Sequence, residues 1–310
     1  MCMRGFFRLY GCILQKKVLQ YKKAREFYMI YTISNEYFQI QLDDFGAELI
    51  SIRFQGKEKL WQNDNGSWSG HAPVMFPACG SCDVVVDGKK YPHFLHGFAR
   101  KNVFAVTDKT DSSITFTLSS DKKTKELYPF DFVFSLTYAV CGDTLWITHQ
   151  AKNTGNKAMY CAFGAHESYA LDKPLENYVL RFEKQETLTS WLHNDNGVLT
   201  GETKSFGTTD TLAIPVPFLE NGNTAIFTGV QSSEVTLEDD AGKKVATVGL
   251  DGFDNVLLWH SDGSQMICIE PWQNLPDYAD KTDVEFSQKK GVNRVEAGGV
   301  YTLKRSVRYY

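Results

Sequence analysis

The sequence feature that most constrains the fold is an alternation of apolar and polar residues with a period of two. It is clearest where Phe132, Phe134, Leu136, Tyr138 and Val140 alternate with smaller or more polar residues. Because successive side chains of a β-strand point to opposite faces, this pattern predicts a strand with one buried face. The same pattern recurs at residues 38–42, 50–54, 114–118 and 145–149.

Turn signals separate these segments, and we expect only one short helix, near Pro276–Lys281. No repeat of fixed period and no linker rich in Pro, Gly or Ser divides the chain. The sequence therefore predicts the all-β class, with a single large antiparallel β-sandwich domain over residues 29–310. The turns contain glycine and lie at residues 55–57, 141–143, 153–155, 240–242 and 261–263.

Residues 1–28 form a basic N-terminal extension that we expect to lie outside the fold. They carry seven Lys or Arg and one acid, Glu26, which gives +6, so the rest of the chain carries −10 within the total of −4. The segment weakly resembles a transit peptide. An extension from an upstream start codon, with Met29 as the working start, is the simpler interpretation.

Charge and cysteine usage limit the partners and the compartment. A body this acidic, without a basic stripe, argues against nucleic acid as a partner. No apolar run approaches the ~18 residues of a membrane span. The seven cysteines are odd in number and scattered, so we expect reduced thiols in a cytoplasmic protein.

The stretch Met266–Trp272 places a carboxylate inside the predicted sandwich. Met266, Cys268 and Glu270 share one face of this strand, and both faces are otherwise apolar, so the strand is expected to be buried and to end at Pro271. A buried carboxylate costs free energy unless it is paired or used. Glu270 is therefore a candidate general base, with a structural ion pair as the alternative.

A second stretch, at residues 161–166, departs from plain alternation. His166 shares a face with Ala162 and Gly164, and two small residues beside a histidine leave a space that packing would normally fill. A ligand in that space is one interpretation. A core histidine with satisfied hydrogen bonds is the other.

Four stretches together resemble the aldose 1-epimerase (galactose mutarotase-like) family, especially its LacX-like and hexose-phosphate mutarotase branch. The resemblance runs from about residue 30 to the C-terminus. It implies a β-supersandwich fold and the interconversion of sugar anomers without metal or cofactor. The stretches are FPACG at 76–80, HGFAR at 96–100, FGAHESY at 163–169 and CIEPWQNLPD at 268–277.

By that resemblance, His166 is the general acid and Glu270 the general base. His96 is implied to bind the substrate, and Arg100 to contact sugar hydroxyls or a phosphate. Trp272 offers an aromatic face on which a sugar can stack. We expect Glu270 to begin ionised and His166 to begin protonated, because each charge favours the other.

The chain also departs from the family pattern. Glu167 stands where proline usually follows the catalytic histidine, and Ser81 stands where many members have arginine. Asn223 takes the place of an aspartate that holds a substrate hydroxyl, and Asn274 replaces a glycine. These departures leave the acid–base pair in place and leave the identity of the sugar open.

Two other functions compete with this interpretation. Cys79, Cys82, His93 and His96 have a spacing close to that of zinc ligands, although no finger helix pattern follows. A non-catalytic carbohydrate-binding or sugar-sensing protein on the same fold is the second alternative.

We predict a mutarotase without metal or cofactor, with a small-molecule sugar as its partner, as a monomer or weak homodimer. The other histidines, His149 and His193 among them, are expected to be surface or core residues without a role.

Overall fold

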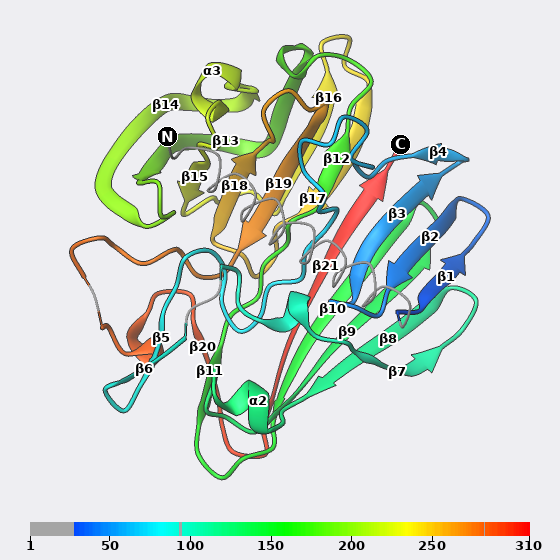
Figure 1. The fold of residues 1–310 in the computed structure, drawn as a ribbon. Helices are drawn as coiled ribbons and strands as arrows, with labels where there is room; N and C mark the ends of the chain where they lie inside the picture. Colours follow the sequence, from blue (N-terminus) through cyan, green and yellow to red (C-terminus); the bar gives the residue numbers. More distant parts are fainter. Residues whose placement is uncertain (1–27, 93–94, 282) are drawn as a thin grey trace, which may run out of the picture.

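The computed structural model describes residues 28–92, 95–281 and 283–310. The predicted basic extension therefore lies, except for Tyr28, outside the described residues. The chain folds into strands joined by short turns, with few helices (Figure 1). None of the helices in the described part of the chain has the length and apolar character needed to span a bilayer.

The first half of the described chain contains β1 to β12 and the helix α2. In chain order the elements are β1 Ile30–Ser34, β2 Phe38–Asp43, β3 Glu48–Phe54, β4 Lys57–Glu58, β5 Val84–Val86, β6 Lys89–Tyr91, β7 Ala105–Lys109, β8 Ser113–Ser119, α2 Lys122–Lys125, β9 Phe132–Cys141, β10 Thr144–Asn153, β11 Met159–Cys161 and β12 Ser168–Ala170.

The second half contains β13 to β21 and the helix α3. In chain order the elements are β13 Tyr178–His193, β14 Leu199–Ala213, α3 Val216–Leu219, β15 Ala225–Thr228, β16 Glu234–Asp239, β17 Lys244–Gly249, β18 Asn255–Trp259, β19 Met266–Trp272, β20 Asn293–Val295 and β21 Val300–Tyr309.

Thirteen of the described strands form one antiparallel sheet, which confirms the predicted all-β sandwich. The β1–β4 sheet covers part of it, with Tyr31 against Phe116 and Phe38 against Tyr309, so that the core lies between the two layers (Figure 1). The order of the large sheet is β12-β19-β18-β15-β13-β16-β17-β21-β10-β9-β8-β7, and β14 pairs with β13.

The alternation in residues 132–140 and 145–149 predicted strands correctly, and the burial patterns of β9 and β10 follow it. In β3 the alternation fails at Ile50, which is only half-buried, while Leu49 is buried. The reason is a β-bulge, because Gln41 pairs with Ser51 but Leu42 pairs with Leu49. The extra residue moves Ile50 away from the core.

Two other local predictions were wrong. Residues 276–281 form no helix, and only residues 279–280 are in a turn. Their backbone groups pair with another segment instead: the backbone N–H of Leu199 donates to the Asp277 carbonyl, and that of Ala279 donates to the Leu199 carbonyl. Strand β19 also continues past Pro271 to Trp272, because Pro271 still offers its carbonyl, which accepts from the backbone N–H of Ala165.

His149 is a core residue of β10. Its ring is buried and stacks on Phe163 at 5.3 Å between centroids. Burial, together with the nearby Arg305 charge, holds the pKa of His149 well below its usual range. The side chain is therefore neutral in the folded protein.

This environment predicts a loss of stability in acid. Below about pH 6.5 the unfolded chain protonates His149 and the folded chain does not, so the free energy of unfolding falls by up to ~1.4 kcal/mol per pH unit for this group. His149→Phe keeps the stacked ring and removes the proton site. Urea unfolding between pH 7.5 and pH 5 should give a smaller slope for the variant, and equal slopes would contradict the assignment.

Candidate active site

His166 and Glu270 face each other from two antiparallel segments. Ser168 pairs with Cys268 and Gly164 bridges to Trp272, so the same register places His166 directly opposite Glu270. Residues in that position on neighbouring strands have Cβ atoms about 4.5–5.5 Å apart. His166 Nδ1 lies 3.6 Å from Glu270 Oε1. The structure thus brings the two predicted catalytic side chains together.

Glu270 is buried, with 2% of its surface exposed. The indole N–H of Trp272 donates to Glu270 Oε2 at 3.1 Å. Burial raises the pKa of Glu270 well above its usual value, the Trp272 hydrogen bond opposes this, and the Glu167 charge adds to it. The protonated carboxyl is the form that this environment favours.

His166 is surrounded by aromatic rings. Trp68 stacks on it at 5.4 Å, while His96 and Trp259 meet it edge-on at 5.2 and 6.0 Å between centroids. Burial lowers the pKa of His166 to about 3, and the charge of Arg100 contributes to the same direction. Burial therefore opposes the charged pair that the sequence led us to expect. Burial favours a neutral pair instead, in which the one proton that the two groups share is on Glu270 and not on His166.

His96 is fixed by the loop that carries the FPACG stretch. The backbone N–H of Gly80 donates to His96 Nδ1 at 3.1 Å, which leaves the ring proton of the neutral imidazole on Nε2. Next to it, Gly97 has φ +73°, and a Cβ there would lie 2.0 Å from the Phe76 carbonyl oxygen. Only glycine permits this approach, which brings the His96 ring next to that of His166.

Two amides after Trp272 join the motif stretches. Asn274 Oδ1 accepts from the backbone N–H of Cys79 at 2.8 Å, and Gln273 Oε1 accepts from that of Phe163 at 2.9 Å. Both amides are buried. Asn274, which departs from the family pattern, therefore connects β19 to the FPACG loop.

The space predicted beside Gly164 is filled by protein. A Cβ on Gly164 would lie 2.6 Å from Cys79 Sγ and 3.0 Å from Trp272 Cδ1. The interpretation that a ligand fills it is therefore wrong. Gly164 is small because another part of the core packs against it.

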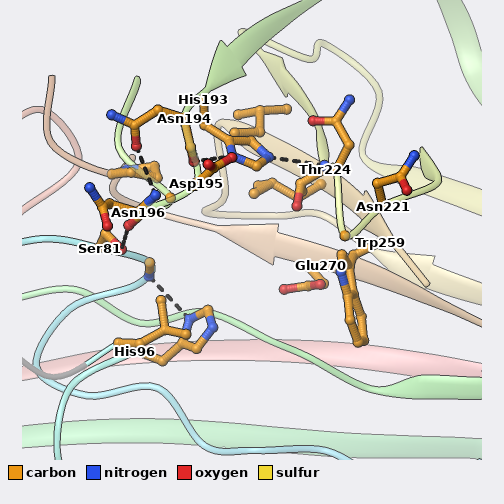
Figure 2. Close-up of a pocket in the computed structure, with 18 of the residues that line it drawn as sticks. Ser81, His96, His193, Asn194, Asp195, Asn196, Asn221, Thr224, Trp259 and Glu270 are labelled. Carbon is orange, nitrogen blue, oxygen red and sulfur yellow. Dashed lines mark hydrogen bonds between the residues drawn. The ribbon is translucent and has the colours of Figure 1, made fainter. Parts of the chain in front are cut away.

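A cavity of about 1180 Å³ opens in front of His166 and Glu270, and all six residues predicted for the site line it. Figure 2 shows His96 and Glu270 at its inner end, and His193, Asn194, Asp195 and Asn196 on another wall. The six predicted residues are His96, Arg100, His166, Asn223, Glu270 and Trp272.

Two turns form the outer wall of this cavity, and no pattern in the sequence pointed to them. Thr224 donates its backbone N–H to His193 Nε2 at 3.1 Å, and Ser81 donates its hydroxyl to the Asn196 carbonyl at 2.8 Å (Figure 2). His193 thus has a structural role, contrary to expectation.

Asn223 lies in the second turn and donates through Nδ2 to the Phe218 carbonyl at 2.8 Å. The residues missed include Trp68, Trp259, Lys204 and the polar side chains of residues 194–196 and 220–221.

Glu167 points away from the cavity and forms an ion pair with Arg305. Their exposed fractions are 2% and 4%. Glu167 precedes β12 at one edge of the large sheet, whereas Arg305 belongs to β21 near the middle of the strand order. The ion pair therefore crosses the interior and connects the backbone beside His166 to the opposite side of the core.

The zinc site that we considered as an alternative lies partly outside the described residues. Cys79, Cys82 and His96 are in the described part of the chain, and His93 lies outside it. Burial raises the pKa of Cys82 to about 12, and the Lys289 Nζ atom lies 3.8 Å from its sulfur.

Comparison with known proteins agrees with this fold. A sequence model of the aldose 1-epimerase family matches residues 29–290. The chromosomal protein LacX of Lactococcus lactis is 29% identical over 276 residues, covering 80% of this chain and 88% of LacX. A galactose mutarotase related enzyme from Lactobacillus acidophilus superposes with a TM-score of 0.84 at 26% identity, covering 91% of this chain and 97% of its own. A galactose mutarotase-like protein from Lactobacillus casei gives the same TM-score and identity, covering 91% and 100%.

The buried ion pair behind His166 generates a prediction about stability. Removing one partner, as in Glu167→Gln or Arg305→Met, should cost about 3–5 kcal/mol, because the other charge remains buried without compensation. The double variant Glu167→Leu with Arg305→Met should recover most of this loss. Denaturant unfolding measures each step.

The control is Lys125→Met, since Lys125 and Asp131 form an ion pair in which both side chains are about half-exposed. It should lose much less stability. A double variant that is no more stable than either single variant would contradict the role assigned to the buried pair.

Proposed function

The chain belongs to the aldose 1-epimerase family, and from that premise we propose that it interconverts the α and β anomers of a hexose or hexose phosphate by general acid–base ring opening. The family makes the chain an isomerase that acts on carbohydrates. The observation that supports the finer proposal is the approach of His166 to Glu270 at 3.6 Å on the inner wall of the cavity.

Mutarotation requires one proton acceptor and one proton donor. As the acceptor removes the proton from the C1 hydroxyl, the C1=O bond forms, the bond from C1 to the ring oxygen breaks, and the donor protonates that oxygen. Rotation about C1–C2 and the reverse steps give the other anomer. We assign the acceptor role in ring opening to Glu270 and the donor role to His166.

The neutral pair that burial favours fits into this cycle. After ring opening, Glu270 holds the proton taken from the C1 hydroxyl and His166 is neutral. Ring closure then uses Glu270 as donor and His166 as acceptor. Burial of both groups therefore stabilises the state reached after ring opening, relative to the charged pair that starts it.

The other predicted residues would orient the sugar. His96 would donate its Nε2 proton to a sugar oxygen, and Arg100 and Asn223 would contact hydroxyls or a phosphate. The indole N–H of Trp272 is used by Glu270, so this residue would position the carboxylate and offer its ring face. Lys204, on the outer wall, supplies a second positive charge for a phosphorylated substrate.

Anomer exchange followed by NMR on fresh α-glucose, α-galactose and their 6-phosphates tests the proposal. Glu270→Gln and His166→Gln should each lower kcat/KM by about 10²–10⁴-fold, the range typical of one proton transfer. Glu202→Gln, an exposed change on β14, is the control and should exchange anomers as the wild type does. Saturable sugar binding without exchange by the wild type would replace the enzyme with the sugar-binding alternative.

A second variant separates phosphorylated from plain hexoses. Lys204→Met should lower kcat/KM for a hexose 6-phosphate by about tenfold, because a charged hydrogen bond is lost, and leave the plain hexose within twofold. Lys152→Met, an exposed change on β10, should change neither value. Equal effects of Lys204→Met on both substrates would show that this lysine does not recognise phosphate.

A further inference from the structure

Three potential metal ligands converge at the catalytic pair, and the proposed reaction uses only two of them. One ligand atom from each of His166, Cys268 and Glu270 lies within 4.8 Å of the other two, and all three residues are buried. We propose that these side chains form a binding site for Zn²⁺, and that bound zinc inhibits the enzyme. Binding stands on the geometry alone, whereas inhibition rests on the proposed function.

Two strands place the three ligands. Cys268 and Glu270 are two residues apart on β19 and therefore share a face, and His166 stands opposite Glu270. Ligands bound to one zinc ion at about 2.0–2.3 Å are about 3.3–3.8 Å from each other in a tetrahedral site. His166 Nδ1 and Glu270 Oε1 already meet this requirement at 3.6 Å. The Cys268 sulfur lies within 4.8 Å of a ligand atom of each of the other two residues.

The chemistry of the ligands selects the ion. Imidazole nitrogen, cysteine sulfur and carboxylate oxygen together are typical of zinc, and three protein ligands leave a fourth position open. Magnesium and calcium prefer sites made of oxygen. The cavity in front of the pair supplies room for the fourth ligand.

The ligand atoms are also oriented for the ion. Trp272 holds Glu270 Oε2 through its N–H, which directs Oε1 toward His166. Such outer hydrogen bonds fix the orientation of metal ligands. Among the described residues, His166 Nδ1 has no hydrogen-bond partner although it is buried. A metal ion would supply the missing partner.

Charge balance permits the ion in a buried place. Zinc binding displaces one proton from the Cys268 thiol and one from the Glu270 carboxyl, and both protons go to solvent. The two anionic ligands then neutralise the charge of Zn²⁺, and His166 contributes a neutral nitrogen. The site therefore adds no uncompensated charge to the interior.

Inhibition follows from the position of the ion. Zinc bound between His166 and Glu270 uses the atoms that would exchange protons with the C1 hydroxyl and the ring oxygen. Sugar and metal would then exclude each other. Zinc should act as a competitive inhibitor that a chelator removes.

The test compares the purified full chain with Cys268→Ser, in Co²⁺ absorption spectra and in Zn²⁺ titration calorimetry. The wild type should show a thiolate-to-cobalt charge-transfer band that Cys268→Ser lacks. The Kd for Zn²⁺ should rise at least about tenfold in the variant, since even loss of an outer-shell partner costs 10–100-fold. Cys268→Ala provides the same comparison if the buried serine hydroxyl destabilises the core.

Two other cysteines are the controls. Cys161→Ser, a buried change outside the three-ligand group, should bind metal as the wild type does. Cys79→Ser tests the alternative zinc site, and loss of the band there but not in Cys268→Ser would overturn the proposal. Equal Zn²⁺ affinity in wild type and Cys268→Ser would also overturn it.

In anomer exchange, Cys268→Ser should remain active and resist zinc. Absence of exchange on every sugar would refute the proposed function, while the spectra would still decide whether the site exists.

Discussion

The ion pair between Glu167 and Arg305 is the interaction on which the geometry of the site depends most. His166 lies two residues before β12, which is the first strand in the order of the large sheet. Backbone hydrogen bonds hold β12 against β19 on one side and against residues 59–61 and 71 on the other. The ion pair adds a connection to β21, and it does so one residue from His166. Because adjacent side chains of an extended segment point in opposite directions, anchoring Glu167 inside turns His166 toward the cavity.

The same burial that positions the acid–base pair also sets its protons. Both groups lie where water cannot stabilise a charge, so the imidazole is favoured as the free base and the carboxyl as the acid. The neutral and the charged arrangement hold the same number of protons, so the proposed cycle would need no net change of proton number to begin. The cost of the charged arrangement decreases when a polar sugar fills the cavity and supplies hydrogen bonds to both groups.

Alternation and turn residues were enough to predict the sandwich, because a strand with one buried face leaves a period of two in the sequence. They failed at Ile50, where a bulge that depends on the partner strand breaks the period. They also failed at residues 276–281, where pairing with Leu199 replaces the bonds of a helix. In both places the outcome is decided by a segment distant in the chain, and no local pattern records it.

The candidate site also combines residues from local motifs with contacts between segments that are distant in the chain. His166, Glu270 and His96, which the sequence analysis singled out from short motifs, do lie together at the cavity. The outer wall could not be predicted, because His193 and Thr224 meet only through the packing of two turns. The space beside Gly164 was misjudged for a related reason, since the atoms that fill it come from Cys79 and Trp272, in two other stretches.

The positions that depart from the family pattern have structural partners in this chain. Ser81 binds the turn of the outer wall, Asn223 binds its own turn, Asn274 holds the FPACG loop, and Glu167 anchors the core. A departure at one of these positions therefore changes which contact supports the site, while His166 and Glu270 remain opposite each other. The register of β12 against β19, together with the bridge between Gly164 and Trp272, keeps these two side chains facing each other.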